Sequence, residues 1–134
     1  MVKKLTNKEL IANLNGLNLF QIREQKYLEQ VGKKLLTGKF NIAYAINKNK
    51  GKLEQALKPY NETMKEILEE YNSEDAKKKG NVKIKEGKEQ EWEEAVRQLQ
   101  EQETEVEIHT VKLKELENLD MDSTDLSCLE FMIE

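Results

Sequence analysis

Apolar side chains in the middle of the chain recur at a helical spacing. Between Phe40 and Tyr71 they form two rows, and each row steps by seven residues. The rows consist of Ile46, Leu53, Tyr60 and Ile67, and of Ala43, Leu57, Met64 and Tyr71, with Lys50 at the one position of the second row that is not apolar. Together the rows alternate four and three residues apart, which is the pattern of a coiled-coil seam. This pattern predicts one long helix of about 45 Å.

Pro59 is the only proline of the chain and lies inside this repeat. A proline in a helix interior removes one backbone hydrogen bond and crowds the carbonyl four residues earlier, at a cost of about 3 kcal/mol. Because the repeat continues in register beyond it, we predict a kinked helix that bends around a partner. The alternative is two helices separated at 58–59.

The opening "LTNKEL" predicts a helix start. Thr6 is the expected N-cap, and Glu9 completes a capping box three residues later. The apolar spacing that follows predicts a helix over about 7–15, with Gly16 near its end. A second helix is expected over roughly 21–36.

In the second half of the chain, apolar residues recur at every second position in some stretches, as in strands, and about every 3.6 positions in others, as in helices. Val82 and Ile84 alternate with polar residues like a short strand, and a helix is expected over about 88–103. A further strand is expected over about 104–113, with its buried face changing near His109. The last element is a short helix whose predicted cap pairs Asp122 with Asp125.

These elements predict a mainly α-helical α+β protein. It combines a long kinked coiled-coil-like helix with a small β-sheet and a short C-terminal helix. We expect one domain over 1–134, with a helical part at about 6–72 and a mixed α/β part at about 80–134.

Charge is distributed unevenly along the chain. Residues 1–58 carry 12 lysines and arginines against 4 acidic residues, whereas residues 59–134 carry 10 against 22. The apolar fraction of 37% is low beside 36% charged residues, as in exposed helices with narrow apolar stripes. Two copies packed antiparallel would oppose unlike charges. We therefore expect a homo-oligomer, at least an antiparallel dimer.

Several classes of function are disfavoured by the residues present. One histidine and one cysteine, far apart in sequence, are too few for a His/Cys metal site, and neither standard phosphate-binding glycine motif occurs. We expect no metal, no cofactor and no catalytic activity. Scarce arginine makes extended nucleic acid an unlikely partner. The chain has no membrane-length apolar run and no signal-peptide pattern, so a cytoplasmic location is expected.

A lysine-rich stretch is the strongest candidate for a binding site. Residues 33–58 hold seven lysines against one acid, Glu54; these are Lys33, Lys34, Lys39, Lys48, Lys50, Lys52 and Lys58. One interpretation is a solvated face that pairs with the acidic half, in the same chain or in a neighbour. The other is a site for a small nucleotide-like anion, with Lys48, Lys50 and Lys52 binding phosphate and Tyr44 or Phe40 stacking. Lys50 occupies a seam position, where it could instead fix register.

Four stretches resemble a family of small uncharacterised proteins of phages and prophages of Gram-positive bacteria. They are "LTNKELIANLNGL", "FNIAYAINKNKGKLEQALKPYNETMKEILEEY", "EWEEAVRQLQEQETEVEIHTVKL" and "DLSCLEFMIE". The resemblance implies a phage protein acting in the bacterial host cytoplasm and transfers no active residue. The expected function is non-enzymatic binding by a homo-oligomer that counters host defence by sequestering a host protein or a small anionic signalling molecule. The alternative is a virion assembly factor or chaperone.

Overall fold

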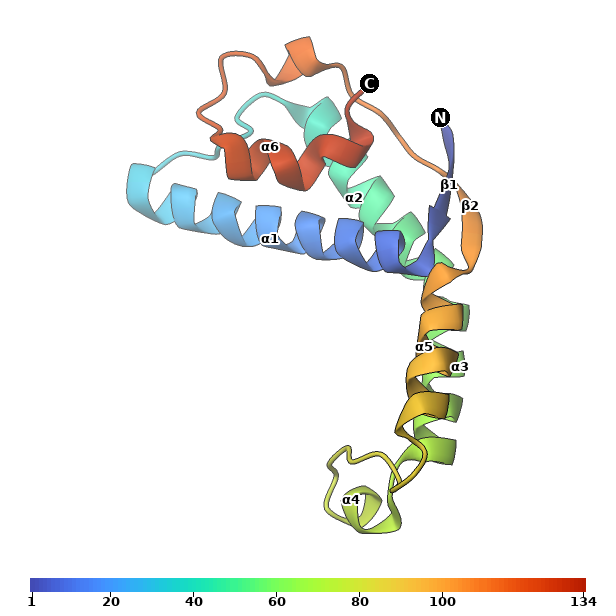
Figure 1. Ribbon diagram of the computed structural model, residues 1–134. Coiled ribbons are helices and arrows are strands. Elements are labelled where there is room, and N and C mark those ends of the chain that lie inside the picture. The colour runs from blue at the N-terminus through green and yellow to red at the C-terminus, as the bar shows by residue number, and fades with distance from the viewer.

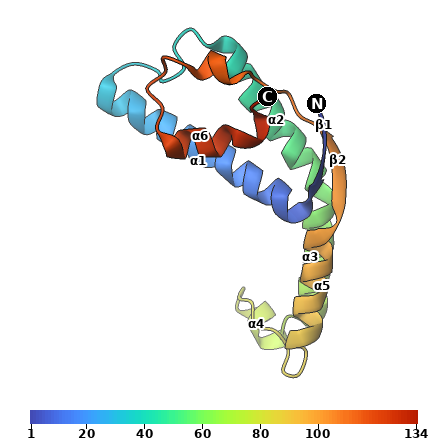
Figure 2. The same ribbon diagram turned by 45° about the horizontal axis from the view of Figure 1, so that its top comes forward.

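The computed structural model describes residues 1–134 and divides into a helical head and a projecting stalk (Figure 1). The elements in chain order are β1 (Val2–Thr6), α1 (Asn7–Val31), α2 (Phe40–Ala56), α3 (Lys58–Tyr71), α4 (Glu74–Lys78), α5 (Glu89–Glu101), β2 (Glu103–Glu107), the 3-10 turn η1 (Leu113–Leu116), α6 (Ser123–Leu129) and the 3-10 turn η2 (Glu130–Met132). The head contains α1, α2, α6 and the two strands. In the stalk, α3 and α5 lie side by side in both views, and α4 lies at the tip (Figures 1 and 2). The mainly helical α+β fold predicted from the sequence is confirmed.

The long bent helix is formed by α2 and α3, which meet at Leu57. This residue has φ −87° and ψ −6°, away from the regular helical ψ of about −42°. Helical hydrogen bonds continue across it, because Leu57 N donates to the Leu53 carbonyl at 3.0 Å and Asn61 N donates to the Leu57 carbonyl at 2.9 Å. Pro59 is the second residue of α3, where a helix leaves backbone donors without intrahelical partners. The chain is therefore kinked at the predicted place, with no gap between two separate helices.

The bend joins the head to the stalk. On one side α2 packs against α1, and on the other α3 packs against α5 (Figure 1). The seam residues Ile46 and Leu53 of α2, and Leu57 at the junction, are accordingly buried within the chain. The elements around which the helix bends therefore belong to the same chain.

Replacing Pro59 by alanine should leave the bend in place. Packing of α2 on α1 and of α3 on α5 holds the two segments, so the free energy of unfolding should change by no more than about 1 kcal/mol. Helix content should stay equal or rise slightly. Circular dichroism with urea titration measures both quantities. A loss of more than about 2 kcal/mol would show that the proline ring itself maintains the bend.

The first helix is longer than predicted. Thr6 and Glu9 form the expected capping box, but α1 runs to Val31 and ends at Gly32, whose φ is +83°. Gly16 does not end the helix. A Cβ atom at Gly16 would lie 3.2 Å from the Cys128 carbonyl oxygen, so this glycine permits close approach of α6. The predicted separate helix over 21–36 is instead the second half of α1.

The sheet consists of two antiparallel strands. β1 pairs with β2 with Val2 opposite Glu107 and Thr6 opposite Glu103. The predicted strand around Val82 and Ile84 is absent, and Ile84 forms only an isolated bridge with Asn72. The predicted strand over 104–113 is shorter, because pairing with β1 ends at Glu107.

The tip of the stalk, residues 72–88, is organised by one asparagine. The buried Asn72 side chain donates to the Asn81 carbonyl at 3.0 Å and accepts from Lys83 N at 2.8 Å. Two backbone hydrogen bonds of 2.8 Å also form here. Ser73 N donates to the Lys83 carbonyl, and Lys85 N donates to the Tyr71 carbonyl. The tip therefore has a defined backbone conformation although it lies far from the head.

Candidate functional site

The predicted site residues divide between two faces of α2. Tyr44, Lys48 and Lys52 follow one another at intervals of four residues, which places them in one row along the helix. Lys50 lies on another face. Its Nζ donates to the Gln21 Oε1 of α1 at 3.0 Å, in a partly buried position. The structure therefore brings three of the four predicted residues together and separates Lys50, which links α2 to α1.

The row forms a basic and aromatic surface with His109. Lys48 Nζ donates to the Tyr44 hydroxyl at 3.2 Å and lies 5.5 Å from the centre of the Tyr44 ring. The rings of Tyr44 and His109 contact edge to face, with centroids 5.4 Å apart. Tyr44 is 55% exposed, so about half of its surface is open to solvent. We call Tyr44, Lys48, Lys52 and His109 the α2 patch.

Asn49 places His109 in the patch. Its side chain is fully buried, donates to the His109 carbonyl at 2.9 Å and accepts from His109 N at 2.8 Å. The amide thus pairs with the backbone of the segment after β2 as a neighbouring strand would. Lys52 contacts the same segment, because its Nζ donates to the Glu107 carbonyl at 2.8 Å. Both contacts hold the segment after β2 against the outer face of α2.

No carboxylate of the same chain neutralises the lysines of the α2 patch by an ion pair. None of the seven lysines between residues 33 and 58 forms an ion pair. The neighbouring Glu107 carboxylate is paired with the terminal amino group at 2.9 Å. That ion pair, with a smaller contribution from Lys52, holds the pKa of Glu107 below its ordinary value. The interpretation in which these lysines pair with the acidic half of the same chain is therefore wrong at the level of side-chain contacts.

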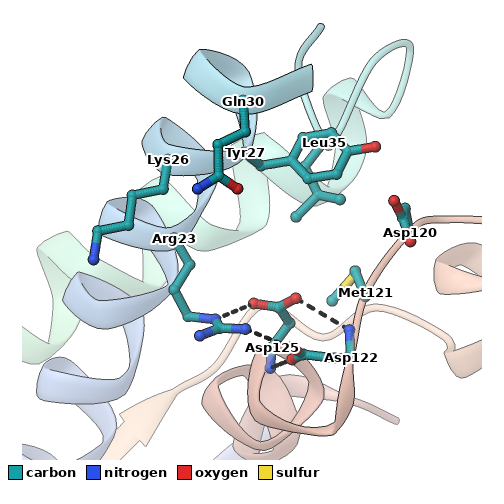
Figure 3. A pocket seen from close by; sticks show the side chains of 9 residues that line it. All are labelled: Arg23, Lys26, Tyr27, Gln30, Leu35, Asp120, Met121, Asp122 and Asp125. Atoms are coloured by element: carbon teal, nitrogen blue, oxygen red, sulfur yellow. Dashed lines mark hydrogen bonds and ion pairs between the residues drawn. The ribbon is translucent and has the colours of Figure 1, made fainter. Parts of the chain in front are cut away.

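A second candidate is a cavity of about 320 Å³ between α1 and the start of α6 (Figure 3). Arg23 Nε donates to Asp125 Oδ1 at 2.6 Å, and Arg23 Nη2 donates to Asp122 Oδ2 at 2.5 Å. Lys26 lines the same cavity but points away from the two carboxylates (Figure 3). Sequence reasoning missed this cluster, because Arg23 lies in the region whose helix was misplaced.

The carboxylates of this cluster are already in use. Asp122 and Asp125 form the predicted reciprocal cap of α6, with bonds of 2.9 Å and 3.1 Å to each other's backbone N. The backbone N–H of Asp125 and the charge of Arg23 hold the pKa of Asp122 below its ordinary value. Both aspartates already accept hydrogen bonds within the chain. Their contacts with Arg23 join helix α1 to the start of helix α6.

Cys128 lies on the buried side of α6. Burial, together with the charge of Asp125, raises the pKa of its thiol. A raised pKa lowers the fraction of thiolate, which is the nucleophilic form. With 7% of its surface exposed, Cys128 belongs to the hydrophobic core.

Two further findings concern metals and membranes. No three histidine, cysteine or acidic side chains come together in a way that could hold a metal ion. None of the helices combines the length and apolar character required to cross a bilayer.

Comparison with protein-family models, curated proteins and solved structures finds no match to this chain.

Proposed function

We propose that this chain is a non-enzymatic binding protein of phage origin that acts as a homo-oligomer. It counters host defence by sequestering a small anionic signalling molecule on the α2 patch. The observation that supports this proposal is the combination, on one side of α2, of two lysines without ion pairs and the exposed rings of Tyr44 and His109. The phage origin and the link to host defence rest on the resemblance of the sequence.

The chemistry of the patch suits a nucleotide-like ligand. Ammonium groups of Lys48 and Lys52 supply donors and charge for a phosphate, and charge-assisted hydrogen bonds are about twice as strong as neutral ones. The exposed ring of Tyr44 offers a surface on which a base can stack, a contact worth about 1–3 kcal/mol. His109 adds a second ring at the edge of the first.

The surroundings favour a small ligand over extended nucleic acid. β2, which precedes the patch, presents Glu103, Glu105 and Glu107 on its exposed positions. A phosphate backbone running along the head would meet these carboxylates, and like charges would oppose binding. A ligand the size of one or two nucleotides can occupy the patch without crossing them.

Replacing Lys48 and Lys52 by alanine should weaken binding of phosphate-bearing ligands by about tenfold for each lysine. Isothermal calorimetry with adenosine monophosphate, a cyclic dinucleotide and inorganic phosphate measures the effect. The wild-type protein should bind at least one nucleotide more tightly than it binds phosphate, because only the nucleotide can stack on Tyr44.

Lys50→Leu is the matched control for this experiment. It removes one lysine from the same helix, but from the face that contacts Gln21. Binding should be unchanged in this variant and about a hundredfold weaker in the double variant Lys48→Ala/Lys52→Ala. Equal affinity in the wild type and the double variant, or no binding to any of the three probes, would contradict the proposed site.

The second candidate function, a virion assembly factor or chaperone, is favoured by the stalk. Its facing helices carry large apolar side chains that are only half buried, among them Tyr60, Met64, Ile67 and Trp92. Such a surface suits a partner protein. Deleting the gene distinguishes the two functions. A sequestering protein is needed only in hosts that carry a defence system, whereas an assembly factor is needed in every host.

A further inference from the structure

A cavity of about 380 Å³ lies between α1, the connecting segment 32–39 and the first half of α2. It is separate from the α2 patch, because none of the residues of that patch lines it. Most of its lining is apolar and comes from three parts of the chain: Leu28, Leu35, Leu36, Phe40, Ala43 and Ile46. A cavity of this size with an apolar lining and a few polar groups is the usual form of a small-molecule site.

Phe40 is an apolar residue of this cavity that folding leaves uncovered. It is 82% exposed, more than any other large apolar residue of the chain. By contrast, Leu35, Leu36 and Ile46 are between 2% and 8% exposed. The cavity thus has buried apolar walls and one aromatic side chain at its opening, where a bound molecule with an apolar body would cover it.

Two charged residues, one of each sign, line the cavity. Glu24 of α1 is half-buried and Lys34 of the connecting segment is exposed. Neither forms an ion pair, with the other or with any further residue of the chain. The amides that line the cavity do have hydrogen-bond partners within the chain: Gln21, Gln25 and Asn47.

The surroundings of Glu24 disfavour its charged form. Burial raises the pKa of its carboxyl group, and the charge of Asp125 adds to this rise, whereas the charge of Lys34 opposes it. A cation in direct contact with a carboxylate stabilises the charged form. Glu24 would therefore gain from an ammonium group placed in the cavity.

We propose that this cavity binds a free amino acid with a large apolar side chain, such as phenylalanine. Its ammonium group pairs with Glu24, its carboxylate pairs with Lys34, and its side chain contacts Phe40 and the apolar walls. Both charges of the cavity are then matched by a ligand that has no net charge itself. A ligand with only one charge would leave the other charge of the cavity unmatched. The site takes a different class of ligand from the α2 patch and does not depend on the function proposed for that patch.

Calorimetry with L-phenylalanine and two analogues tests the two ion pairs. Phenylpropionate lacks the ammonium group and should bind the wild type about tenfold more weakly than phenylalanine does. Phenethylamine lacks the carboxylate and should bind about threefold more weakly, because Lys34 is exposed and an exposed ion pair contributes less. Glu24→Gln should weaken binding of phenylalanine about tenfold and leave phenylpropionate unchanged. Lys34→Gln should weaken phenylalanine about threefold and leave phenethylamine unchanged.

Glu54→Gln and Lys33→Gln are the matched controls. They make the same chemical changes at exposed positions that do not line the cavity, so both should bind phenylalanine as the wild type does. No binding of phenylalanine at millimolar concentration, or equal affinities in the wild type and Glu24→Gln, would overturn the proposal. Equally tight binding of N-acetylphenylalaninamide would overturn it as well. That analogue has neither charge and resembles a residue within a peptide, so the cavity would then be assigned to a segment of a partner protein.

Discussion

Replacing Asn49 by leucine is expected to lower the free energy of unfolding by about 2–4 kcal/mol. The leucine is similar in size but makes neither hydrogen bond, so the N–H and carbonyl of His109 lose their partners. Denaturation by urea, followed by circular dichroism, measures the loss. Hydrogen exchange at the His109 amide should become faster as well.

Asn47→Leu is the control for the Asn49 variant. It makes the same chemical change two residues earlier, at an exposed position where the amide has only a long contact of 3.4 Å with Gln21. Its stability should stay within about 0.5 kcal/mol of the wild type. If the two variants were equally stable, the segment after β2 would be held by its apolar side chains and not by Asn49.

Replacing Arg23 by methionine is expected to lower the melting temperature by about 5 °C at neutral pH. Methionine keeps the apolar length of the side chain but leaves the buried carboxylate of Asp125, which is 5% exposed, without its cation. The contact between α1 and α6 should loosen as a result. Differential scanning calorimetry across a range of pH measures this effect.

The difference in melting temperature between the wild type and Arg23→Met should depend on pH, and the direction of this dependence follows from the pKa of Asp122. The pKa of Asp122 is lowered in the folded state, so its contribution to stability is present above the unfolded-state pKa. That contribution is lost as the pH falls through the lower folded-state pKa. The gap in melting temperature between the wild type and Arg23→Met should therefore be full at neutral pH and shrink below about pH 4.

Arg97→Met provides the comparison on the surface. Arg97 also bridges two carboxylates, those of Glu94 and Glu101, but on the exposed side of α5. Exposed ion pairs contribute little, so its melting temperature should fall by no more than about 2 °C. A similar loss in both arginine variants would mean that the Arg23 cluster is no more than a surface ion pair.

Features governed by neighbours in sequence could be predicted. The capping boxes of Thr6 with Glu9 and of Asp122 with Asp125 occur as expected, because each is completed within four residues. The kink near Pro59 was predictable for the same reason.

Features that depend on contacts between residues far apart in the sequence could not be predicted from the sequence pattern. Gly16 looks like a helix end, and only the approach of Cys128 explains it inside α1. Strand β1 is five residues long and exists through its pairing with β2, far along the chain. For the site, Asn49 carried a usable signal. It falls between Ile46 and Leu53 at helical spacing, which places a polar side chain on the buried face, where it needs a hydrogen-bond partner.

The stalk has a consequence for the order in which the chain folds. The head is assembled from residues before α3 and after α5, and Asn7 N joins them by donating to the Gln102 carbonyl at 2.9 Å. The Asn7 side chain also donates to the carbonyl of Leu99, in the last turn of α5, at 2.7 Å. Closing a flexible loop across the intervening stretch costs conformational entropy that grows with its length. A hairpin of α3 and α5 that forms first brings these two segments together. The stalk then shortens the loop that remains to be closed between the two parts of the head. We therefore expect the head to pack after the stalk has formed.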